Sequence, residues 1–273
     1  MTTKRGWTVA LVGAAVAGVL GACGASGGDP MAGCSDASRS AADPGDAEPM
    51  LILGSATLSP TIVYSDGAVV IPNAAASDAG ADAAGFLRVP MMMPGYHGDQ
   101  PGGFQAGWLS DCELEVVTEL ADDLFSPGVD FGDPQVTDMG STSVTYAGVT
   151  VSIYAFSRSN DEDWGLSGAQ RQARADLAEL WDAVESSAEL TGEVEIDRLF
   201  LTFYGSIGDD EVTDWPLATP VSELSLERCV TVSDPAQVAA MLARLDEDEE
   251  LLEDSDWRLA VVAAAPGIAD CEG

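Results

Sequence analysis

The chain has 273 residues, in which 46 Asp and Glu stand against 11 Lys and Arg, so its formal net charge is −35. This charge excludes direct binding to nucleic acid, which needs a basic surface. Because 46% of the residues are hydrophobic, the chain also differs from a wholly disordered acidic protein, and its length allows one large domain or two small ones.

The N-terminal residues have the pattern of an export signal. Lys4, the single lysine of the chain, stands next to Arg5, and residues 6–28 carry no charge. The apolar part of this run, residues 7–20, is too short for a comfortable membrane span. We therefore predict a signal peptide over residues 1–22.

The apolar run ends at Leu20-Gly21-Ala22-Cys23, which resembles the lipobox of bacterial lipoproteins. The resemblance implies that Cys23 receives a thioether-linked diacylglycerol and becomes the N-terminus after cleavage. Two acyl chains hold a protein stably on a membrane, since each buried CH₂ contributes about 0.8 kcal/mol. The resemblance further implies export and anchoring by lipid to the outer face of the cytoplasmic membrane. An ordinary secretory signal with an incidental cysteine is the alternative.

The residues after Cys23 have the composition of a tether. Residues 24–48 are mostly Gly, Ala, Ser, Asp and Pro without apolar periodicity. We therefore assign residues 23–49 to a flexible acidic tether and residues 50–273 to a single domain. Loss of residues 1–22 would leave nine Arg, no Lys and all 46 acids, a net charge of −37. This composition resembles that of exported proteins from high-GC Gram-positive bacteria.

Several β-strands are predicted along the domain. Runs rich in β-branched and aromatic residues flank two turn dipeptides, Asp66-Gly67 and Ala147-Gly148, which indicates two hairpins. Between them, residues 73–107 are rich in Gly, Pro and Ala, and we expect one long surface loop. The expected strands are 61–64, 68–72, 143–146, 149–156, 198–204, 228–232 and 258–263.

Three helix starts can be recognised. Ser110-Asp111-Cys112-Glu113 and Ser167-Gly168-Ala169-Gln170 fit the capping box, in which the first and fourth side chains bind each other's backbone N–H groups. Asp234-Pro235 is typical of an N-cap followed by proline at the first helical position. Because strands and helices do not alternate regularly, we predict the α+β class, with a mainly antiparallel sheet, about three helices and two disulfides.

The disulfides are predicted from the cysteine count. If Cys23 is lipidated, four cysteines remain, and an even number in an exported chain suggests two bonds with three possible connectivities. We favour Cys229–Cys271, which would tie the strand before the third helix to the C-terminal tail, and this leaves Cys34–Cys112. A zinc site made from the four cysteines is disfavoured, because no C-x₂-C pair is present.

The sequence predicts no catalytic, cofactor or metal site. The single histidine, His97, lies in a Gly- and Pro-rich stretch, and no nucleophile-elbow motif is present. Met91–Met93 with His97 would suit Cu(I), but three consecutive methionines in an extended segment cannot all face one point. The acidic run that begins at Asp246 lacks the spacing of an EF-hand calcium loop.

The sequence thus predicts a location more sharply than an activity. We expect an envelope lipoprotein with a non-catalytic binding or modulating domain. Its expected partners are the membrane, reached through the N-terminal lipid, and an envelope protein or polymer. A carboxylate-dependent cell-wall hydrolase is one alternative, and it needs two carboxyl groups at catalytic separation in a cleft. A module that binds a small ligand or metal is another, and a concave apolar pocket would favour it.

Overall fold

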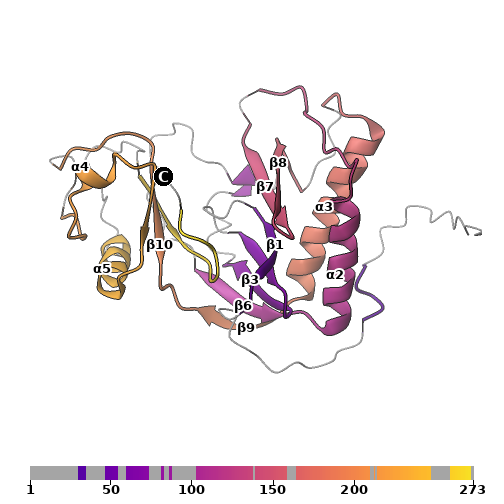
Figure 1. Ribbon diagram of the computed structural model, residues 1–273, viewed down its shortest axis with the longest axis horizontal. Helices are drawn as coiled ribbons and strands as arrows, with labels where there is room; N and C mark the ends of the chain where they lie inside the picture. Colours follow the sequence, from indigo (N-terminus) through magenta and orange to yellow (C-terminus); the bar gives the residue numbers. More distant parts are fainter. Residues whose placement is uncertain are drawn as a thin grey trace, which may run out of the picture.

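The computed structural model describes residues 30–34, 47–54, 60–73, 81–82, 86–87, 103–137, 139–158, 164–209, 212, 214–246 and 259–271. These residues form four layers, in which two helices, a seven-stranded sheet, a three-stranded sheet and two further helices follow one another (Figure 1). The helices are α2 (Asp111–Leu124), α3 (Gly168–Ser187), α4 (Val221–Leu224) and α5 (Pro235–Asp246). None of the described helices is long and apolar enough to cross a membrane.

The strands of the two large sheets pair antiparallel throughout, which confirms the predicted α+β class. The larger sheet has the order β8-β7-β1-β2-β3-β6-β9, the smaller one β11-β10-β12, and β4 pairs with β5 in a short ribbon. The strands are β1 (Pro49–Leu53), β2 (Thr61–Tyr64), β3 (Ala68–Pro72), β4 (Ala81–Asp82), β5 (Phe86–Leu87), β6 (Phe104–Trp108), β7 (Ser141–Tyr146), β8 (Val149–Tyr154), β9 (Glu189–Val194), β10 (Leu199–Phe203), β11 (Cys229–Val232) and β12 (Leu259–Ala263).

Both predicted hairpins are confirmed, and their turn residues explain why. Gly67, between β2 and β3, has a φ of 90°. Ala147 and Gly148, between β7 and β8, have φ values of 48° and 79°. Two consecutive positive φ angles are those of a type I′ turn, whose twist matches that of the paired strands.

The three predicted helix starts are also confirmed. Ser110 and Ser167 each accept a hydrogen bond from the backbone N–H three residues later, and the reciprocal bonds of both capping boxes are present. The Asp234 carboxylate accepts a hydrogen bond of 3.0 Å from the Gln237 N–H at the start of α5. These bonds satisfy backbone donors that a helix leaves unpaired.

The expectation of one long loop over residues 73–107 is wrong where β4 pairs with β5, and at its end, where β6 lies inside the larger sheet. Gly107, one of the glycines whose abundance suggested a loop, has a packing role. A Cβ on Gly107 would lie 3.0 Å from the Glu189 carbonyl oxygen and 3.2 Å from Leu190 Cδ2 on β9. Glycine at this position allows the backbones of β6 and β9 to approach closely. From composition alone, the same glycine suggests a loop.

The central strands β2 and β3 of the larger sheet are buried on both faces. Val63 and Val69 on one face pack in a core with Val117 of α2 and Leu177 of α3. The opposite face packs against the smaller sheet, in a core that includes Ile62, Tyr64, Val70, Phe104, Phe200 and Ala263. Successive strand residues point to opposite faces, so a strand buried on both sides is continuously apolar.

The smaller sheet joins the second core to a third. Phe200 of β10 faces the larger sheet, whereas Leu199 and Leu201 pack with Val238 and Met241 of α5. This alternation explains how a single strand, LFLTF, belongs to two cores. The smaller sheet is therefore a middle layer, and the space between the two sheets is where the candidate site lies.

The two predicted disulfides are present. Cys34 and Cys112 have Cα atoms 5.5 Å apart, and those of Cys229 and Cys271 are 5.8 Å apart. Residues 30–34, within the predicted tether, pack on the domain, because Met31 is 5% exposed in the core beneath α2 and α3. Cys23 and residues 1–22 lie outside the described residues.

Candidate functional site

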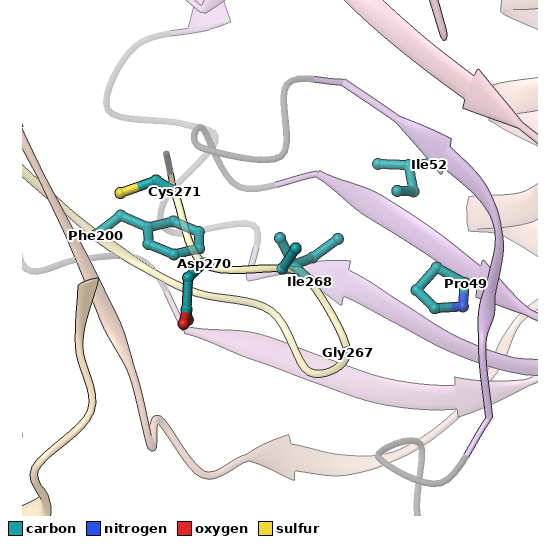
Figure 2. Close-up of a pocket in the computed structure, with 8 residues that line it drawn as sticks. Pro49, Ile52, Phe200, Gly267, Ile268, Asp270 and Cys271 are labelled. Atoms are coloured by element: carbon teal, nitrogen blue, oxygen red, sulfur yellow. The ribbon is translucent and has the colours of Figure 1, made fainter. Parts of the chain in front are cut away.

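An open pocket of about 320 Å³ lies between the two sheets. β1 and β10 each supply part of its wall, and the C-terminal turn after β12 supplies the rest (Figure 2). Apart from Asp270, its side chains are apolar or sulfur-containing, as is usual for small-molecule pockets. The lining residues are Pro49, Ile52, Phe200, Gly267, Ile268, Ala269, Asp270 and Cys271.

The turn that forms one wall is held from the larger sheet by Tyr64. The Tyr64 hydroxyl donates a hydrogen bond of 2.5 Å to the Pro266 carbonyl oxygen. Gly267 follows with a φ of +69°, and a Cβ there would lie 3.4 Å from the Tyr64 ring and 3.5 Å from Pro49 Cγ. Glycine is therefore required for both backbone angle and space.

Arg198, directly before β10, holds the same turn from the other sheet. Its Nη2 donates to the Ala265 carbonyl oxygen, and its Nη1 lies 3.3 Å from a carboxylate oxygen of Asp270. The Asp270 side chain is 72% exposed at the pocket mouth. An exposed pair of this kind contributes little to stability, so its main effect is to place charge beside an apolar wall.

The second disulfide fixes the end of the turn. Cys271 is bonded to Cys229 of β11, and its N–H donates to the Thr231 hydroxyl at 3.1 Å. The wall is thus covalently joined to the smaller sheet and hydrogen-bonded to the larger one. A binding surface held in this way loses little conformational entropy when it is occupied.

Tyr64, which holds the pocket wall, is buried and has a raised pKa. Burial raises the pKa of Tyr64 well above its ordinary value, against an opposing effect of Arg198. A neutral phenol donates to Pro266 over the whole physiological range. Among the described lining residues Asp270 carries the one carboxyl group, so the lining of this open pocket is mostly apolar.

A polar cluster lies at the face of the larger sheet that α2 and α3 cover. Glu185 of α3 accepts hydrogen bonds from Trp181 at 2.7 Å and Thr61 at 2.9 Å, and it pairs with Arg158 at 2.8 Å. Arg158 also pairs with Asp182, and its guanidinium lies 5.4 Å from the Trp181 ring centroid. Through Thr61 of β2, this cluster ties α3 to the larger sheet.

Arg174 of α3 is the most buried charge of the described chain, at 2% exposure. Its guanidinium donates to four backbone carbonyl oxygens, those of Phe131, Gly132, Tyr154 and Ala155, at 2.6 to 3.1 Å. It clamps the loop after α2 against the end of β8. The spacing of Arg174 from Leu177, Ala178 and Trp181 on the apolar face was the sequence signal that could have found it.

The structure brings together two of the predicted residue groups, the two cysteine pairs. Cys23, His97 and Met91–Met93 lie outside the described residues. Within the part of the chain that is described, no three His, Cys, Asp or Glu side chains are placed to hold a metal ion. Apart from Cys271, the pocket residues were missed, since their meeting depends on contacts between β1, β10 and the C-terminal turn.

Comparison with known proteins adds no relative to this picture. No family model, no curated protein and no solved structure matches the chain.

Proposed function

We propose that the protein is an exported lipoprotein whose domain, anchored through Cys23, binds a component of the cell envelope. On this proposal the diacylglycerol on Cys23 holds the domain at the outer face of the cytoplasmic membrane. The domain acts there by binding, through the pocket between its two sheets.

The cysteine arrangement is the observation that carries this proposal. The chain has five cysteines, and four of them form two disulfides within the fold. Structural disulfides are characteristic of oxidising, exported compartments. The remaining cysteine is Cys23, which stands at the last position of the lipobox-like tetrapeptide. The pairing therefore supports both export and a separate chemical role for Cys23.

The pocket supports binding of a small apolar group. Its wall from Ala265 to Cys271 is held by Tyr64, Arg198 and the disulfide to Cys229, and Phe200 and Ile52 face it from the two sheets. A volume of about 320 Å³ is at the lower end of ordinary ligand sites. An apolar side chain of an envelope protein, or an apolar part of a small ligand, matches this lining.

Metabolic labelling with a fatty acid tests the anchoring. The wild-type chain should incorporate label and sediment with membranes, and Cys23→Ser should abolish the label. Cys34→Ser with Cys112→Ser is a matched control, because it removes two other cysteines and should keep the label. Equal labelling of the Cys23→Ser chain would contradict the lipoprotein proposal.

Titration of the purified domain with Nile red, a neutral apolar dye, tests the pocket. Ala269 is exposed and lines the pocket, so Ala269→Trp should fill the space and weaken dye binding at least tenfold. The control is Ala175→Trp, the same change at an exposed position of α3, which should bind dye as the wild type does. Equal binding by both variants, or no binding by the wild type, would contradict the assignment of the pocket.

A further inference from the structure

The connection between Cys23 and the folded domain is short. Met31 is 5% exposed and belongs to the core beneath α2 and α3, and the Cys34 N–H donates to its carbonyl oxygen at 2.9 Å. Seven residues, 24–30, separate Cys23 from Met31. At about 3.5 Å per residue, eight steps of chain reach at most about 28 Å.

The first disulfide determines where this connection joins the fold. Cys34 is bonded to Cys112, the second residue of α2, so residues 30–34 lie beside the N-terminal end of that helix. Figure 1 shows this segment next to α2, on the side of the molecule opposite to α4 and α5.

We infer that the Cys34–Cys112 disulfide orients the domain on the membrane, with the N-terminal end of α2 facing the bilayer and the α4–α5 end facing away. This inference rests on the proposed lipid at Cys23. Beyond the lipid anchor, the inference names the surface that faces the lipid headgroups. It also names the disulfide that determines which surface this is. It also leaves the pocket, which lies between the two sheets, at the side of the anchored molecule.

The end of the domain that would face the membrane carries carboxylates, which anionic headgroups repel. Asp111 and Glu113 lie in the first turn of α2, and Asp66 lies in the neighbouring turn, where the Leu109 N–H donates to the Gly67 carbonyl oxygen. Carboxylates are repelled by anionic headgroups over about one Debye length, roughly 8 Å at physiological salt. A longer connection would let this end turn away more freely than 28 Å of chain attached beside it does.

Energy transfer in vesicles tests the orientation. The lipidated chain, checked by intact mass, is placed in vesicles of phosphatidylcholine and anionic phosphatidylglycerol that contain an acceptor-labelled lipid. A fluorescent non-natural amino acid serves as donor at Glu115, exposed on α2, or at Leu226, which follows α4 and is 76% exposed. Transfer from position 115 should exceed that from position 226 at least twofold. Equal transfer from the two positions would overturn the inference.

Two changes test the role of the bond. Cys34→Ser with Cys112→Ser should lower transfer from position 115 at least twofold, whereas Cys229→Ser with Cys271→Ser should leave it unchanged. If the first pair of changes impairs folding, insertion of sixteen Gly and Ser residues between Gly28 and Asp29 lengthens the connection about threefold, from eight to twenty-four steps, with both disulfides intact. Unchanged transfer in this insertion variant would overturn the inference.

The mass measurement separates the two levels of the proposal. A chain without lipid on Cys23 would contradict the proposed function itself. A chain that carries lipid but shows equal transfer from positions 115 and 226 would contradict the orientation alone.

Discussion

The hydroxyl of Tyr64 on β2 donates a hydrogen bond of 2.5 Å to the carbonyl oxygen of Pro266, 202 residues further along the chain. This bond joins the larger sheet to the turn that closes the pocket. Tyr64 is fully buried, so loss of the hydroxyl would leave the Pro266 carbonyl with one partner fewer in an apolar setting. The bond therefore contributes both to stability and to the position of the pocket wall.

Tyr64→Phe should lower the free energy of unfolding by about 1–3 kcal/mol, the cost of leaving a buried polar group unpaired. Urea denaturation followed by tryptophan fluorescence measures this change. The matched control is Tyr204→Phe, because Tyr204 is 55% exposed. The control should change stability by less than about 0.5 kcal/mol. Equal effects of the two substitutions would show that the hydrogen bond to Pro266 contributes nothing.

Local features of this fold could be predicted because a few adjacent residues determine them. Asp66-Gly67 and the capping box at Ser110 each act within four residues, and both turn and helix lie where the sequence indicated. Gly107 was misleading, because its role depends on the backbone of Glu189, 82 positions away. The structural role of such a glycine depends on which strand lies beside it.

The candidate site was less predictable than the fold for the same reason. The bond of Cys229 to Cys271 could be proposed from counting cysteines, yet nothing near Cys271 indicates that it faces Phe200 and Ile52. The pocket is formed where β1, β10 and the C-terminal turn come together. This contact depends on how the layers pack together, and the residue pattern within a single strand does not predict it.

Removal of the second disulfide should loosen the pocket wall. Cys229→Ser with Cys271→Ser opens a link across 42 residues, and the expected loss of stability is about 2–4 kcal/mol. Hydrogen exchange should also accelerate at the backbone N–H groups of residues 267–271, because this turn is no longer bonded to β11. Cys34→Ser with Cys112→Ser is the control, and it should leave exchange in this turn unchanged. Unaltered exchange in the first variant would contradict the assigned role of the bond.

Arg174 should be essential to the fold although it is charged. Arg174→Met keeps much of the side-chain volume but removes the donors to four backbone carbonyl oxygens, and we expect a loss of about 2–4 kcal/mol. Arg174→Lys should be almost as unstable as Arg174→Met, because one ammonium group cannot donate to all four carbonyl oxygens as the planar guanidinium does. Gln172→Met, at an exposed position of the same helix, is the control for thermal unfolding. Full stability of Arg174→Lys would show that charge alone suffices.

The raised pKa of Tyr146 predicts how the free energy of unfolding changes in alkaline solution. Burial, followed by the hydrogen bond to Asp122 at 2.7 Å and the charge of Asp122, raises the pKa of Tyr146 to about 12. In the unfolded chain the phenol loses its proton near pH 10. Between these values the folded state binds more protons than the unfolded state. The stabilisation is therefore complete below about pH 10 and is lost as the pH rises towards 12.

Urea unfolding at intervals from pH 8 to pH 11.5 measures this loss. Tyr146→Phe removes the titrating group, so its free energy of unfolding should fall less steeply above pH 10 than that of the wild type. Asp122→Asn should give an intermediate slope, because burial, the larger cause of the shift, remains. Part of the slope should persist in both variants, since burial also raises the pKa of Tyr64. A Tyr146→Phe slope identical to the wild-type slope would rule out Tyr146 as a source of the alkaline loss.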